Sequence, residues 1–233
     1  MAKIQRVYLH FSGVVFSVFL ILLLLVTSVE AVAYWIPGYY EREYTKYGVA
    51  ADVDMEMPDL LYVTKEMMAY LRGARDDLRV ETTIGGQPME FFNAREIAHM
   101  EDVRGLFMGA VQLRLALLVL MVLLIVGWLV RRADLRSFLP LDFCVGSGLF
   151  LAACALVGFL FYTDFTKYFT IFHLIFFDND LWILDPATDR LINIVPEPFF
   201  MDTALRIGLI FFLALSVLFV VCLVLARKQK HLQ

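Results

Sequence analysis

Charged residues are scarce in this chain of 233 residues. Asp, Glu, Lys and Arg make up only 19% of the sequence, whereas 61% of it is hydrophobic. A soluble globular domain carries about 25% charged and about 45–50% apolar residues. The excess of apolar side chains therefore excludes an ordinary soluble domain and indicates burial in a lipid bilayer. The formal net charge of −4 argues against nucleic acid as a partner.

Cysteine is scarce as well, and its placement excludes two classes of site. The three cysteines, Cys144, Cys154 and Cys222, all fall inside apolar runs. An odd number of cysteines outside loops does not build a disulfide framework, and their spacing is not that of a metal site. We interpret all three as small packing residues of the apolar segments.

Long apolar runs are what the sequence does contain. Four of them cover residues 7–29, 106–130, 143–163 and 207–226, and the one Asp, Glu, Lys or Arg within them is Arg114. Each run has the roughly 20 residues that a helix needs to cross the hydrocarbon core. The first run is longer than the 7–15 apolar residues typical of a signal peptide, so we interpret it as a retained anchor. The sequence thus predicts an all-α integral membrane protein with four transmembrane helices.

The basic residues indicate how these helices are oriented. Residues 37–105 and 164–206 carry more acids than bases, whereas three short segments hold eight bases and one acid, Asp134. Because cytoplasmic segments are enriched in Lys and Arg, we expect both termini in the cytoplasm and both long segments outside. The eight bases are Lys3, Arg6, Arg131, Arg132, Arg136, Arg227, Lys228 and Lys230. The predicted division is a first transmembrane helix in residues 1–36, an outer segment in 37–105, a second helix in 106–131, a cytoplasmic loop in 132–142, a third helix in 143–163, an outer segment in 164–206, and a fourth helix with a cytoplasmic tail in 207–233.

The first outer segment is predicted to form a small α+β extracytoplasmic cap. Pro58 favours the start of a helix that ends before Gly73. Alternation over residues 78–84 leads into Gly85-Gly86, which predicts a β-hairpin with its return strand near residues 89–92. Asn93 and Glu96 have the spacing of a capping box, so a helix is expected to begin there and to run into the second span.

The second outer segment is crowded with aromatic residues, which favour the membrane–water interface. We interpret residues 165–177 either as an extension of the third span or as a helix lying in the interface. Asp185-Pro186 predicts a turn beyond it.

Two of the four histidines are candidates for chemistry. His99 precedes the second span and His173 follows the third. A short loop joins these spans, so we expect antiparallel neighbours that bring both histidines to a similar depth outside. The alternative is two unrelated interfacial residues.

Carboxylates accompany His99. Glu96, His99 and Asp102 recur at a spacing of three, so they lie close to one face of a helix. Glu96 or Asp102 could orient the imidazole and set its tautomer, as a general base requires. Two other readings are a solvated charged face and a metal site built from Glu96, His99, Asp102 and His173, although no HExxH pattern supports a metal.

Serine and cysteine are absent from both outer segments. An acyl-enzyme on either residue type is therefore not expected beside the two histidines, and Thr166 and Thr170 are weak substitutes. If an acyl group is transferred here, the nucleophile belongs to the substrate. Arg114, about two turns inside the second span, either lines a polar cavity or reaches lipid phosphates.

Taken together, these residues give the chain a resemblance to the bacterial lipoprotein intramolecular transacylase family over nearly its whole length. The most specific segments are residues 91–107 and 168–189. They contain Glu96, His99-Met100, Asp102-Val103-Arg104, Phe172-His173, Phe176-Phe177, Asn179-Asp180, Trp182 and Asp185-Pro186. The two functional histidines of the family match His99 and His173.

The resemblance implies an acyltransferase of the bacterial cytoplasmic membrane, without cofactor or metal, whose active site lies outside. Such an enzyme moves the sn-2 acyl chain of a diacylglyceryl-cysteine lipoprotein to the α-amino group of the same cysteine, giving the lyso-form lipoprotein. Its partners are diacylated bacterial lipoproteins and membrane phospholipid. We expect Glu96, Asp102, Arg104, Asn179 and Asp185 to support or orient the histidines, and Phe172, Phe176, Trp182 and Arg114 to face substrate or lipid.

A mechanism follows from this resemblance as a hypothesis. An α-amine has a pKa of about 7.7–8.0, so a base must take its proton when it attacks an ester at neutral pH. We assign this role to His99 and donation to the oxyanion or the leaving sn-2 oxygen to His173, an assignment that could be reversed. Two alternatives are a metal-dependent hydrolase of membrane lipids or lipoproteins and a non-catalytic membrane scaffold.

Overall fold

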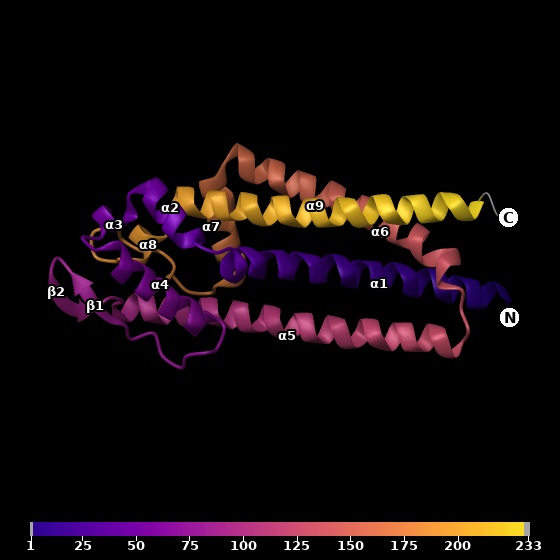
Figure 1. Cartoon of the computed structure of the whole chain (residues 1–233), viewed down its shortest axis with the longest axis horizontal. Coiled ribbons are helices and arrows are strands. Elements are labelled where there is room, and N and C mark those ends of the chain that lie inside the picture. The colour runs from indigo at the N-terminus through magenta and orange to yellow at the C-terminus, as the bar shows by residue number, and fades with distance from the viewer. Residues whose placement is uncertain (1, 231–233) are drawn as a thin grey trace. The chain divides into compact units, whose positions relative to one another are not determined.

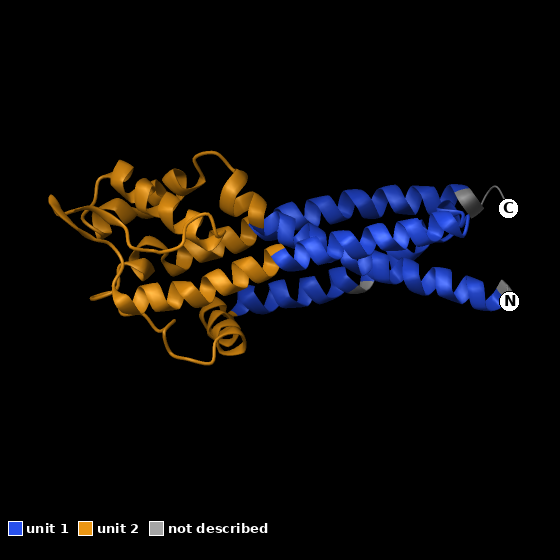
Figure 2. Ribbon diagram, turned by 90° about the horizontal axis from the view of Figure 1, so that it is seen from below, with its two compact units in different colours: residues 1–29, 112–163, 207–233 blue, residues 30–111, 164–206 orange. Residues whose placement is uncertain are grey.

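The computed structural model describes residues 2–230, and the chain divides into two compact units. The first unit comprises Met1–Val29, Gln112–Thr163 and Ile207–Gln233, and the second comprises Glu30–Val111 and Asp164–Arg206 (Figure 2). The side chain of Lys230, one of the basic residues used above, lies outside the described part of the chain.

Four long helices dominate the structure (Figure 1). They are α1 (Ala2–Glu30), α5 (Ala94–Val130), α6 (Leu135–Thr163) and α9 (Glu197–Lys230). All four are long and apolar enough to cross a membrane, which confirms the predicted four-span fold. At about 1.5 Å per residue, each is longer than the roughly 30 Å hydrocarbon core.

Packing in the first unit centres on α1. Phe16 of α1 packs in one apolar cluster with Trp128 of α5 and with residues of α6. Ile21, further along α1, packs in a second cluster with Phe143 of α6 and Phe211 of α9. The first helix therefore contacts the other three.

The second unit contains the shorter elements. They are a π-helical turn η1 (Ala31–Trp35), α2 (Tyr39–Tyr47), α3 (Val49–Asp52), α4 (Met57–Leu71), β1 (Glu81–Ile84), β2 (Gln87–Glu90), α7 (Phe165–Phe176) and α8 (Leu191–Ile194). The first turns of α5 and of α9 also belong to this unit. The predicted helix after Pro58 is confirmed as α4.

The predicted hairpin is also confirmed, with a shift. Strands β1 and β2 pair antiparallel, with Ile84 opposite Gln87. Gly85 and Gly86 both have positive φ, 57° and 75°, as a two-residue type I′ turn requires. The return strand starts at Gln87, two residues earlier than predicted, because a two-residue turn fixes the register directly.

Helix α7 is separate from the third span. Asp164, at φ −160° and ψ 83°, interrupts the helical backbone after Thr163 and caps α7. Of the two readings of residues 165–177, extension of the span is therefore wrong. The location of α7 at the membrane interface stays a prediction.

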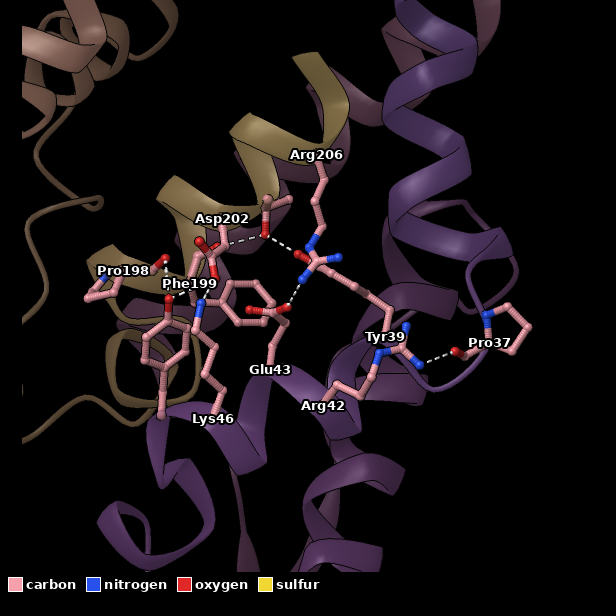
Figure 3. Close-up of polar contacts among 11 residues, drawn as sticks. Pro37, Tyr39, Arg42, Glu43, Lys46, Pro198, Phe199, Asp202 and Arg206 are labelled. Atoms are coloured by element: carbon pink, nitrogen blue, oxygen red, sulfur yellow. Dashed lines mark hydrogen bonds and ion pairs between the residues drawn. The ribbon is translucent and has the colours of Figure 1, made fainter. Parts of the chain in front are cut away.

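Helix α2 was not predicted, and polar contacts hold it to the start of α9 (Figure 3). Arg206 donates to the Glu43 carboxylate at 2.7 Å, and Lys46 and Tyr47 both donate to Asp202. Glu43 is buried, with 1% of its surface exposed. The inward face of α2 thus includes a carboxylate and tyrosines, so it lacks the apolar periodicity by which a helix is recognised.

Candidate active site

The start of α5 positions His99. The Asn93 side-chain oxygen accepts the Glu96 amide at 3.0 Å, and Glu96 Oε2 accepts the Asn93 amide at 2.6 Å. This reciprocal pair is the predicted capping box, which is thereby confirmed. Because it fixes the first turn of α5, His99 follows on a well-defined helix.

Glu96 also joins α5 to α8. Its Oε1 accepts the Leu191 amide at 2.5 Å, and the whole residue is buried. Backbone amides thus occupy both carboxylate oxygens, so Glu96 does not orient the His99 imidazole directly as expected. Its contribution is to fix the backbone that carries His99.

His173 is carried by α7. The Asp164 side chain caps the helix by accepting the Lys167 amide at 3.0 Å. Further along, His173 Nδ1 lies 2.7 Å from the Phe169 carbonyl oxygen. A carbonyl only accepts hydrogen bonds, so Nδ1 carries the proton and Nε2 of the neutral ring has a free lone pair.

The two histidine rings lie side by side. Their centroids are 6.3 Å apart and their planes are inclined by 32°. Both residues are buried, with 8% of His99 and 7% of His173 exposed. Nδ1 of His99 is buried and has no hydrogen-bond partner among the described residues. The predicted closeness of the two histidines is confirmed, whereas their catalytic roles stay a prediction.

Aromatic side chains surround the histidine pair. Trp182 stacks on His173 with ring centroids 4.8 Å apart, and Phe177 lies 5.5 Å from each imidazole. Phe172 meets His173 edge-on at 5.4 Å. Phe176 packs on Phe172 at 4.7 Å and is 51% exposed, so it lies one ring further from His173. Trp182 and Phe172 are therefore the expected aromatic residues that line the pair.

These surroundings set the charge of His173. Burial lowers the pKa of the imidazole, and the hydrogen bond to the Phe169 carbonyl offsets this only in part. The pKa therefore lies below the ordinary 6.5, and the ring is neutral at pH 7. A neutral imidazole with an unprotonated Nε2 is the form that a general base needs.

Asp102 and Asn179 contact each other rather than the imidazoles. Asn179 Nδ2 donates to the Asp102 carboxylate at 2.8 Å, and Trp182 Nε1 donates to the Asn179 carbonyl oxygen at 3.0 Å. Asp102 and Asn179 are thus linked to the Trp182 indole that stacks on His173, and their supporting role stays a prediction.

Asp185 lies in the predicted turn, and a residue that was not predicted secures it. The Asp185 carboxylate accepts the Ala187 amide at 2.9 Å. Asp189, which is buried, accepts both the Asp185 amide and Asn93 Nδ2 at 2.7 Å. Burial raises the pKa of Asp189, but these hydrogen bonds outweigh it and hold the pKa below its ordinary value. The sequence signal for Asp189 is its place at the end of the Asp-Pro turn.

The two expected arginines lie elsewhere. Arg104 donates to the Asp76 carbonyl at 3.2 Å and lies 4.6 Å above the Tyr70 ring. It fastens the loop after α4 to α5, so its expected support of the histidines is corrected. Arg114 belongs to the first unit, half-buried on α5, and its role stays a prediction.

The groups proposed for other chemistries are also located. Thr166 donates to the Glu197 carboxylate and Thr170 to the Thr166 carbonyl, both at 2.9 Å. These hydroxyls therefore hold α7 together and to α9. Across the part of the chain that the structure describes, no three His, Cys, Asp or Glu side chains are grouped as a metal ion requires.

The chain matches a known protein family over most of its length. A profile of the family described as lipoprotein intramolecular transacylase Lit matches residues 14–200, which include Glu96, His99 and His173. The chain belongs to the lipoprotein intramolecular transacylase family. The family is one of membrane proteins, and its name describes acyl transfer on lipoproteins.

The chain is also similar to solved structures and to a protein known from its sequence. Three in meso structures of the membrane integral lipoprotein intramolecular transacylase Lit from Bacillus cereus, two of them histidine variants, have TM-scores of 0.76 at 20% identity. The similarity covers 99–100% of this chain and 98–100% of those chains, and it shows a shared fold. An uncharacterised protein from Aquifex aeolicus (strain VF5) is 33% identical over 126 residues, a match that spans 52% of each chain.

Proposed function

We propose that this protein moves the sn-2 acyl chain of a diacylglyceryl-cysteine lipoprotein to the α-amino group of the same cysteine, which gives the lyso-form lipoprotein. Membership of the transacylase family supports acyl transfer on a lipoprotein. The observation that carries the proposal is the buried pair of His99 and His173, with ring centroids 6.3 Å apart. Two such imidazoles can take a proton from an attacking amine and return one to a leaving oxygen.

The nucleophile in this reaction is the amine of the substrate itself. Residues 37–105 and 164–206 contain no serine or cysteine. The hydroxyls of Thr166 and Thr170 are engaged in other hydrogen bonds. Attack within one substrate molecule also supplies proximity, which is worth about 7–11 kcal/mol when the reacting groups are well oriented.

His173 is the base in this mechanism, because its Nδ1–H is held by the Phe169 carbonyl and its unprotonated Nε2 carries a lone pair. Nε2 removes a proton from the α-amine as the nitrogen attacks the sn-2 ester carbonyl and the N–C bond forms. The bond from that carbon to the sn-2 oxygen then breaks, and a ring N–H of His99 protonates the departing oxygen. The new sn-2 hydroxyl then relays one proton, taking it from His173 as it gives its own to His99, so both rings end neutral. This order reverses the one expected from sequence.

Burial of the pair favours transfer to the amine over hydrolysis. The two histidines are 8% and 7% exposed and lie among aromatic rings. A site of this kind limits the access of bulk water, the competing nucleophile, to the ester. The reaction requires no cofactor and no metal.

The setting we propose is a bacterial cytoplasmic membrane with both termini in the cytoplasm and the histidine pair outside. The distribution of Lys and Arg between the short and long segments supports this orientation. On α7, Phe172 and Phe176 are 38% and 51% exposed. We propose that they meet the acyl chains of the lipoprotein substrate or of neighbouring phospholipid.

Mass spectrometry of lipoprotein N-terminal peptides tests the function. Cells that contain this protein should yield N-acylated, monoacylglyceryl peptides, and cells with the His173→Ala variant should yield the diacylglyceryl form with a free amine. Identical peptides from both cells would refute the transfer. A chelator distinguishes this reaction from that of a metal-dependent hydrolase. It should leave acyl transfer unchanged, whereas it would inhibit the hydrolase.

A further inference from the structure

Three residues of α5 form a stripe next to the turn at residues 178–182. Arg95, His99 and Asp102 are spaced by four and three residues, so they share one face of the helix. Arg95 donates to the Asp180 carbonyl and lies 3.5 Å from the Asp180 carboxylate. Asp102 accepts Asn179 Nδ2 at 2.8 Å. The turn is therefore tied to the stripe on both sides of His99.

The turn is also cross-linked within itself. The Asn179 side-chain oxygen accepts the Leu181 amide at 3.0 Å, and the Asp180 carbonyl accepts the Ile183 amide at 3.0 Å. The Asn179 carbonyl accepts Trp182 Nε1 at 3.0 Å. Because these bonds make the turn one small rigid piece, the ties to α5 also fix the indole.

The indole in turn limits the movement of His173. It stacks on the imidazole with planes inclined by 28° and ring centroids 4.8 Å apart. Phe169 contacts the same imidazole edge-on at 4.4 Å, and its carbonyl holds Nδ1. With these contacts in place, Nε2 has one favoured direction.

We propose that Arg95 and Asp102 are positioning residues, which hold the Trp182 indole against His173 through the 178–182 turn and so aim Nε2 at the substrate. The inference rests on the proposed function in one respect, namely that His173 is the base. Neither Arg95 nor Asp102 touches the reacting atoms. Their effect on His173 passes through the indole. Their charges also act on His99, whose pKa Asp102 raises and Arg95 lowers, so the Asp102→Asn variant, which removes the charge and keeps the hydrogen bond, separates the two effects.

The fluorescence of Trp182 tests the contact without any substrate. The chain has three tryptophans, Trp35, Trp128 and Trp182, so Trp35→Phe with Trp128→Phe leaves one emitter. A protonated imidazole quenches an indole stacked on it. Emission should therefore fall on acidification, with a midpoint below 6.5 because burial lowers the pKa of His173. If the double variant does not fold, the difference in emission between wild type and Trp182→Phe supplies the same signal.

Substitution of Asp102 then separates positioning from bulk structure. Asp102→Leu should abolish the quenching step, and Asp102→Asn should restore it, because its amide oxygen still accepts from Asn179. Glu101→Leu removes an adjacent, exposed carboxylate and should leave the step unchanged. Arg95→Met should weaken the quenching step, because it removes the contacts between Arg95 and Asp180.

Kinetics complete the test. Asp102→Leu should lower kcat by roughly 10- to 100-fold with a smaller change in KM, since a displaced base costs rate more than binding. Asp102→Asn should recover most of the loss. If Asp102→Leu keeps the quenching step or the wild-type kcat, the proposal is overturned while the transfer reaction stands. If the wild type transfers no acyl chain but shows the quenching pattern, the function fails and the positioning contact stands.

Discussion

The two histidines differ in the hydrogen bonding of their Nδ1 atoms. His173 donates Nδ1–H to the Phe169 carbonyl four residues earlier in α7, at 2.7 Å. His99 has a buried Nδ1 that no described residue contacts by a hydrogen bond. Such a difference cannot be seen in sequence, because it depends on the side-chain rotamer at each position. It is the reason why the base is assigned to His173 in the proposed mechanism.

Replacement of either histidine should remove most of the activity. His99→Ala and His173→Ala should each lower the rate of transfer by about 10²- to 10⁴-fold, the usual contribution of general acid–base catalysis. The measurement is lyso-form production by purified variants that retain the wild-type elution profile in detergent. Thr166→Val and Thr170→Val serve as controls and should keep most of the rate. A trapped acyl-threonine would show that the route is covalent.

Burial of neutral His173 should also make folding stability depend on pH. The pKa of His173 in the folded state is below 6.5, the ordinary value that it takes in the unfolded chain. At a pH between these two pKa values, the unfolded chain binds more protons than the folded one. Stability is therefore lost as the pH falls through 6.5 toward the folded pKa. Thermal unfolding in detergent should show this loss from pH 7.5 downward, and His173→Gln should reduce it, leaving the part due to His99, whose pKa burial lowers to about 4. An unchanged slope in the variant would contradict the burial of a neutral ring.

At the scale of elements, Glu96 joins α5 to α8. Its two oxygens accept the Asn93 and Leu191 amides at 2.6 and 2.5 Å. In Glu96→Gln one of these amides faces an NH₂ group, and leaving it unpaired should cost about 1–3 kcal/mol of unfolding free energy. Thermal unfolding measures the loss, with the exposed Glu101→Gln as the matched control. Equal melting temperatures for the two variants would argue against this link.

The same elements show what could be predicted from sequence. The capping box at Asn93 and Glu96, helix α4 and the Gly85-Gly86 hairpin were predicted because each is fixed by residues close together in the chain. The second partner of Glu96, Leu191, is 95 residues away, so no local pattern indicates it.

Helix α2 was missed for a similar reason. Its buried Glu43 pairs with Arg206, 163 residues later. A charged residue in a short polar segment is predicted to be exposed as long as its distant partner is unknown. The roles expected for Arg104 and Glu96 required correction because sequence spacing gives the face of a helix but not the contacts of a side chain.

At the scale of the whole molecule, the proposed function requires the second unit to face outward. Thr188→Cys, in the 164–206 segment, should react with an impermeant thiol reagent added to intact cells. Ser137→Cys, in the first turn of α6, should react only after the cells are opened. Both positions are exposed, and the three native cysteines can be replaced first. Labelling of Ser137→Cys from outside would reverse the proposed orientation.

Transfer within a single substrate molecule is the central claim, and isotope labelling tests it most directly. The purified protein would receive an equal mixture of two diacylglyceryl lipopeptides, one with a heavy peptide and a heavy sn-2 acyl chain, the other light in both. The account predicts that the acyl chain on each product amine carries the label of its own peptide, as read by tandem mass spectrometry. Mixed labels in the N-acylated product, or heavy chains released as free fatty acid, would contradict it.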